Sequence, residues 1–96
     1  MSNVNEYKDI VALHPGYYIA DVIEDMEISQ AEFATGMGTT AKTLSQLING
    51  QANISNDLAK KLSVMLGTSL DVWQNLQNTY DQKLIEIQLA KDIDAQ

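Results

Sequence analysis

Polar side chains that can read DNA bases share one face of a short predicted helix, residues 41–49. The amides of Gln46 and Asn49 can pair with adenine edges, and Lys42 can reach guanine or phosphate. The methyl groups of threonine and alanine can contact thymine. The pattern predicts a DNA-reading surface, whose members are Ala41, Lys42, Thr43, Ser45, Gln46 and Asn49.

The residue types give little indication of catalysis or metal binding. His14 is the only histidine, the chain has no cysteine, and no nucleophile stands at a recognisable spacing from His14. We expect His14 to cap a helix or to pack. Asp21, Glu24 and Asp25 could act as paired acids and bases, but on an exposed helical face they are typical of solvated charge. The sequence therefore predicts no enzyme, metal site, cofactor or small-molecule ligand.

Two helices joined by a tight turn must position the reading surface. Ser29 is expected to begin the first helix, because Glu32 follows it at capping-box spacing. The glycines of residues 36–38 end that helix, since glycine tolerates the left-handed backbone of a helix end. Thr39 or Thr40 then caps the second helix.

The second helix has an apolar face opposite its polar one. Leu44, Leu47 and Ile48 recur at the helical period and should pack inward, and Gly50 ends the helix. Two helices, a glycine turn and a polar outer face form a helix-turn-helix. A capped helix with a polar face also occurs in any small helical domain, so the flanking sequence must decide between the two interpretations.

Charge is distributed unevenly along the chain. Of the net −7, residues 1–27 carry −5, residues 28–66 carry +1 and residues 67–96 carry −3. Since phosphate neutralisation drives DNA affinity, one such unit should bind weakly, and we expect a homodimer on a two-part site. The acidic flanks favour a basic protein partner, and we assign its contact to the N-terminal side, Glu6 to Glu27, where the charge is denser and lies outside the motif. The residues expected to bind it are Asp21, Glu24 and Asp25.

Three more helices are expected, over residues 15–26, 56–66 and 70–89, each with a recognisable start and an apolar stripe. In the last helix the apolar residues approach a heptad seam. They are Leu70, Trp73, Leu76, Tyr80, Leu84 and Ile87. Trp73 is expected in the core, whereas Tyr80, Leu84 and Ile87 are expected to form the dimer interface.

The organisation predicted for the chain is all-α, a compact five-helix bundle. Residues 1–13 form an arm, as a short helical turn or an ordered segment, and show no strand-like alternation. Residues 14–81 form the helix-turn-helix domain, and residues 82–96 extend the last helix, with 91–96 frayed. Because no apolar run approaches about 20 residues and no signal peptide is recognisable, a cytoplasmic location without membrane contact is expected.

Five motifs occur in a fixed order within residues 14–81. They are H-P-G-x-x-I at 14–19, I-S-Q-A-E-F-A at 28–34, G-T-T-x-K-T-L-S-x-L-I-N-G at 38–50, I-S-N-D-L-A-K-K-L at 54–62 and G-T-S-x-x-x-W-x-N-L-Q at 67–77. This set resembles the HigA-type antitoxins, the plasmid maintenance antidote branch of the XRE and Cro-like helix-turn-helix family. The resemblance implies a five-helix, lambda-repressor-like DNA-binding domain.

The same resemblance implies two partners. One is a HigB-type RNase toxin that cleaves mRNA and is neutralised by the antitoxin. The other is operator double-stranded DNA, bound as a homodimer to repress the antitoxin's own operon. A phage-repressor-like regulator without a toxin is the alternative, and a small basic protein encoded in the same operon would distinguish the two.

Site residues can be carried over from the family's pattern. Gln30 falls near a phosphate at the start of the first helix, and Asn49 falls near the backbone after the second. The groove-facing positions are Thr40, Ala41, Lys42, Thr43 and Gln46. At residues 41–43 relatives often have Arg or Ser instead, which leaves the operator sequence open.

Overall fold

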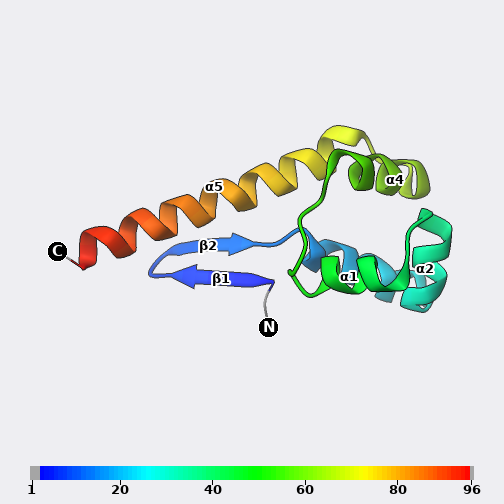
Figure 1. Cartoon of the computed structure of the whole chain (residues 1–96), viewed down its shortest axis with the longest axis horizontal. Coiled ribbons are helices and arrows are strands. Elements are labelled where there is room, and N and C mark those ends of the chain that lie inside the picture. Colours follow the sequence, from blue (N-terminus) through cyan, green and yellow to red (C-terminus); the bar gives the residue numbers. More distant parts are fainter. Residues whose placement is uncertain (1–2, 96) are drawn as a thin grey trace.

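Five helices and one β-hairpin make up the computed structural model, which describes residues 3–95 (Figure 1). The elements are β1 (Val4–Tyr7), β2 (Ile10–Leu13), α1 (Gly16–Met26), α2 (Gln30–Met37), α3 (Ala41–Ile48), α4 (Asn56–Leu66) and α5 (Leu70–Asp94). Helices α1–α4 and the start of α5 form one end of a molecule that measures 49 × 24 × 20 Å. The hairpin and the rest of α5 extend from that end, so the fold is less compact than the expected bundle.

The hairpin corrects the all-α prediction for residues 1–13. β1 and β2 pair antiparallel, with Val4 opposite Leu13 and Tyr7 opposite Ile10. Each strand has only four residues, too few for a period of two to stand out from the sequence. The two-residue turn, Lys8-Asp9, contains no glycine, so the sequence lacks the usual signal of a hairpin turn. Lys8 itself adopts the positive φ, at 56°. Residues 1 and 2 of the predicted arm lie outside the described part of the chain.

The inner face of the hairpin covers α5 and corrects the predicted dimer interface. Tyr80 and Ile87 are only 7% and 6% exposed, and they form a second core with Ala12 of β2. Leu84 and the hairpin's Ile10 pack against this core. The seam predicted on α5 therefore has a partner within the same chain, which a helical periodicity cannot distinguish from a second copy.

The end of α5 is also ordered further than predicted. Residues 91–94, which we expected to fray, continue the helix to Asp94. Asp94 accepts a hydrogen bond from the hydroxyl of Tyr7 and lies 2.7 Å from the ammonium of Lys8. Those two donors lower the pKa of Asp94 below its usual value. The turn of the hairpin thus holds the end of α5, while residue 96 lies outside the described chain.

Most of the apolar residues expected to face inward on the helices lie in the main core. The exceptions are Leu70 of the α5 stripe, which is 41% exposed, and Tyr18 and Met26 of the α1 stripe, which are 38% and 44% exposed. The fully buried members of the core come from α1 to α4, with Trp73 of α5 nearly as well buried. They include Ile19, Phe33, Leu44, Leu47 and Leu62. Of the helices described, none has the length and apolarity needed to cross a membrane.

The first turn of α1 lies directly against the end of α3. Gly16 is buried, and a Cβ atom added to it would collide with the backbone carbonyl of Leu47. A backbone carbonyl cannot move aside as a side chain can, so only glycine allows this approach. The contact sets the distance between α1 and the end of α3.

We therefore expect Gly16→Ala to lower the free energy of unfolding by at least about 2 kcal/mol, because the methyl group forces α1 and α3 apart. Urea denaturation measures the change. Gly36→Ala is the matched control: its Cβ would lie 2.9 Å from Cε of Met65, the flexible end of a side chain. That variant should lose less than about 1 kcal/mol, since alanine also favours the helix. Equal losses in the two variants would contradict the role of the Gly16 contact.

Candidate nucleic-acid interface

The first helix of the predicted motif, α2, begins as expected at Ser29. The Ser29 hydroxyl accepts a hydrogen bond from the backbone N–H of Glu32 at 3.1 Å, and the Glu32 carboxylate accepts one from the N–H of Ser29 at 3.3 Å. This reciprocal pair is the predicted capping box. The helix ends at Gly38, whose φ of 82° is the left-handed conformation that glycine adopts at little cost.

The cap of α3 is Thr40, which decides between the two threonines that the sequence left open. Its hydroxyl accepts a hydrogen bond from the N–H of Thr43 at 3.1 Å. From this start, Leu44 and Leu47 point inward and are fully buried, as predicted. The cap and the buried leucines together fix which face of α3 remains outside.

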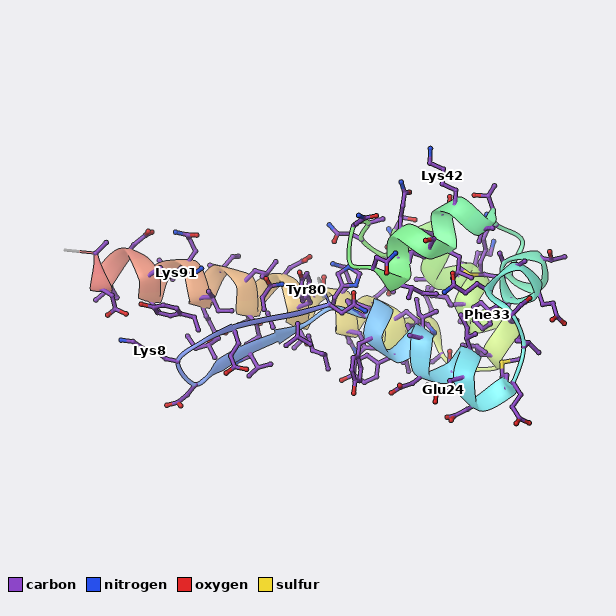
Figure 2. The ribbon with its side chains drawn as sticks, turned by 90° about the horizontal axis from the view of Figure 1, so that it is seen from below. Lys8, Glu24, Phe33, Lys42, Tyr80 and Lys91 are labelled. Carbon is purple, nitrogen blue, oxygen red and sulfur yellow. The ribbon has the colours of Figure 1, made fainter. Side chains whose placement is uncertain are left out.

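The outward face of α3 carries a stripe of three polar side chains. Lys42, Gln46 and Asn49 follow one another at steps of four and three, so they lie on one side of the helix. Figure 2 shows Lys42 pointing away from the body of the protein. Within residues 3–95, Lys42 has no ion pair and the side chain of Gln46 makes no hydrogen bond. Lys42 is exposed and Gln46 is half-buried, and neither side chain is held by a partner among the described residues.

The other predicted contact residues surround this stripe. Gln30, Thr40 and Ala41 are exposed, whereas Thr43 is half-buried. The Thr43 hydroxyl accepts a hydrogen bond from Thr40 at 2.9 Å and keeps its own hydrogen to donate, beside a methyl group that can make an apolar contact. The structure therefore brings the predicted residues of α3 to one surface, with Gln30 at the start of the neighbouring α2.

The acidic residues of α1 lie on another side of the molecule. In Figure 2, Glu24 of α1 and Lys42 of α3 point toward opposite edges. Asp21 and Asp25 of the same helix are also exposed. The structure thus separates the negative charge of α1 from the polar face of α3. Among the described residues, no three His, Asp or Glu side chains cluster as ligands of a metal would.

Contacts from the N-terminal segment hold the end of α3, and our sequence analysis missed them. The side-chain amide of Asn3 donates to the carbonyl of Ile48, the last residue of α3. The backbone N–H of His14 in turn donates to the carbonyl of Asn3 at 2.7 Å. His14 and Gly16 belong to the H-P-G-x-x-I motif, but nothing in the sequence indicated that Asn3 reaches a residue 45 positions away.

His14 is buried where α1, the hairpin and α5 meet. Its Nδ1 accepts a hydrogen bond from the N–H of Gly16 at 2.9 Å, and its ring packs edge-on against Tyr80 with centroids 4.9 Å apart. The cap and packing roles expected for His14 are therefore confirmed. Burial lowers the pKa of His14, and the backbone of Ala52 and the charge of Asp81 oppose this less strongly. The neutral form is favoured.

Comparison with known proteins identifies one matching family and several similar chains and structures. The family model for helix-turn-helix proteins matches residues 19–73. An HTH-type transcriptional regulator of Escherichia coli, YddM, is 35% identical over 79 residues, which are 82% of each chain. A Nostoc punctiforme protein assigned to the antidote proteins of plasmid maintenance systems has a TM-score of 0.83 and 34% identity, over 86% of this chain and 91% of the other. Antitoxin HigA of Pseudomonas aeruginosa, solved with the higBA promoter, has a TM-score of 0.78 and 29% identity, over 88% and 94%.

The burial of His14 predicts a specific loss of stability in mild acid. Below the ordinary histidine pKa of about 6.5, the unfolded chain binds a proton that the folded chain excludes, so the free energy of unfolding should fall as the pH decreases from 7.5 to 5.5. His14→Asn keeps an acceptor for the N–H of Gly16 but cannot titrate, and its decrease over this range should be smaller. Urea denaturation at each pH measures both slopes, and identical slopes would show that His14 does not cause the dependence.

Proposed function

The chain belongs to the helix-turn-helix family, and on that basis we propose that it is the antitoxin of a type II toxin–antitoxin pair. In this role it binds operator DNA as a dimer, represses its own operon and neutralises a HigB-type RNase. Relatives described as antidote proteins and antitoxins, which match most of the chain, support the proposal.

The outward face of α3 is the observation that carries the DNA-binding part. Thr40 caps the helix, two leucines anchor its inner face, and Lys42 points outward. Gln46 and Asn49 follow Lys42 on the same side of the helix by their spacing. Such a helix can enter the major groove, where amides and a lysine distinguish base edges. The Pseudomonas aeruginosa antitoxin that resembles this chain was solved with its promoter, which supports the same role here.

A dimer follows from the low positive charge of this surface. One unit offers Lys42 as the cation on α3, so it neutralises few phosphates, and two units on adjacent half-sites combine their contacts. We place the dimer contact on the face of α5 opposite the hairpin. Three aliphatic side chains spaced by four residues remain exposed there, Ile85, Leu89 and Ile93, at 62%, 57% and 68%. This ridge replaces the buried seam that the sequence suggested.

The toxin part rests on charge and family resemblance. Residues 1–27 carry −5, and α1 exposes Asp21, Glu24 and Asp25 on a side away from Lys42. A basic RNase would be attracted to that side, and carboxylates bound to its cationic side chains would block their use on RNA phosphates. Toxin and operator could then be bound together.

A regulator without a toxin is the second candidate, because the Escherichia coli relative carries the name of a transcriptional regulator. The two candidates share the DNA-binding surface and differ in the protein partner. A small basic protein encoded beside this chain, which co-purifies with it and loses its RNase activity in the complex, would support the antitoxin.

The stripe on α3 predicts that Gln46→Ala weakens operator binding by about 1–3 kcal/mol, the value of one good base contact. Binding to random DNA should change little, because Gln46 contacts bases and not phosphates. A fluorescence titration of labelled operator measures the affinity, and its end point should give two chains per duplex.

The matched control is Gln82→Ala, which removes an exposed amide from α5, away from α3. It should bind operator as the parent does. An equal loss on operator and random DNA in Gln46→Ala would show that Gln46 does not read bases, and one chain per duplex would contradict the dimer.

The acids of α1 predict how the toxin binds. Asp21→Asn, Glu24→Gln and Asp25→Asn together should weaken toxin binding at least about tenfold at low salt, and they should reduce its salt dependence. Isothermal titration at several salt concentrations measures both quantities.

The control makes the same charge change at three exposed acids outside α1: Asp9→Asn in the hairpin turn, Asp57→Asn in α4 and Asp92→Asn in α5. We expect a smaller loss, since these carboxylates do not form one surface. If both triple variants bind the toxin equally well, the toxin docks elsewhere.

A further inference from the structure

An apolar groove runs between the hairpin, the start of α1 and the first half of α5. Its volume is about 270 Å³, and Val11, Leu13, Tyr18, Val72 and Leu76 form most of its floor. Val11 and Val72 are 47% and 41% exposed, although large aliphatic side chains are usually buried. We call this surface the Tyr18 groove.

The groove belongs to a larger uncovered apolar surface. Val11 points to the face of the hairpin away from the Tyr80 core, and its cross-strand neighbour on that face is Glu6. Val4 of the same face is 40% exposed, and Tyr17 packs edge-on beside Tyr18 with ring centroids 5.8 Å apart. Exposed apolar side chains that gather in this way commonly mark a binding surface.

Acidic side chains occur on the three elements that form the groove, outside its immediate lining, and we call them the acidic border. Asp21 and Asp25 follow Tyr18 by one and two turns of α1, so they continue its face of the helix. Glu6 adjoins Val11, and Asp71 precedes Val72 in the first turn of α5. Within residues 3–95 none of these four carboxylates forms an ion pair, while the one lysine of the groove, Lys83, lies 3.4 Å from Glu86.

The acidic border favours a basic protein over a second copy of this chain as the occupant of the groove. A second copy of the chain would bring the same four carboxylates together, with only Lys83, already paired with Glu86, to compensate them, and each copy carries −7. Like charges across an interface are unfavourable. A basic protein supplies cations for these carboxylates, and one of its apolar side chains can fill the groove.

We propose that the Tyr18 groove is the docking site for a basic protein segment, in which an aliphatic or aromatic side chain fills the groove between lysines or arginines that meet the acidic border. The inference extends the proposed function, because it gives the toxin an apolar anchor beside the charges of α1. The groove supplies the buried apolar centre and the carboxylates supply the polar rim, as in protein interfaces generally.

The Val72→Asp variant distinguishes a partner anchored in the groove from a partner held by charge attraction alone. The variant adds an acid, so a partner held by charge alone would bind equally well or better, whereas a partner anchored in the groove should bind at least about tenfold more weakly. The fold should tolerate it, since Val72 is partly exposed and an acid suits the first turn of a helix. Val64→Asp is the matched control, on α4 and 78% exposed.

The small basic protein encoded beside this chain is titrated by calorimetry into the parent and both variants, and circular dichroism verifies that each is folded. A loss in Val72→Asp with at most a twofold change in Val64→Asp supports the groove. Equal affinities in the two variants overturn the groove and leave the toxin proposal in place. Failure of the parent to bind overturns both. A dimer that Val72→Asp dissociates without changing partner affinity identifies a self-interface and also overturns the inference.

Discussion

The close approach of Gly16 to the carbonyl of Leu47 determines how the rest of the molecule is arranged. It brings the start of α1 against the end of α3, and the collision that any Cβ would cause leaves no other residue for this position. Asn3 and His14 complete the contact by holding the carbonyl of Ile48 and the N–H of Gly16. The orientation of the polar helix thus depends on residues far from it in the sequence.

The separation of charges explains how a strongly acidic chain can carry a DNA-binding surface. Residues 28–66 are close to neutral, and Lys42 points to the side of the molecule opposite Glu24. Since exposed charges are screened over about 10 Å at moderate salt, the acids of α1 oppose DNA at α3 only weakly. In the proposed function, the same separation lets a protein partner bind at α1 while the polar face of α3 binds DNA.

The hairpin covers the apolar seam of α5 that resembles an interface between two chains. Tyr80 and Ile87 recur like an interface seam, but β1 and β2 cover them, and Tyr80 also accepts a hydrogen bond from Asn5 and contacts the ring of His14. The helix therefore has two apolar faces with different roles. One stabilises the protomer, and the other, around Leu89, is exposed along the free half of the helix.

Local interactions allowed the sequence by itself to determine the helices and the polar outward face of α3. Ser29 with Glu32 marks a helix start within four residues, and the spacing of Leu44 and Leu47 defines an inward side, so these features needed no distant contact. The hairpin, the burial of Tyr80 and the reach of Asn3 to Ile48 were decided only by the tertiary structure. The hairpin strands are neighbours in sequence, but their packing on α5 and the reach of Asn3 to Ile48 join segments tens of residues apart. Neither a short strand nor an apolar seam specifies such a partner until the chain has folded.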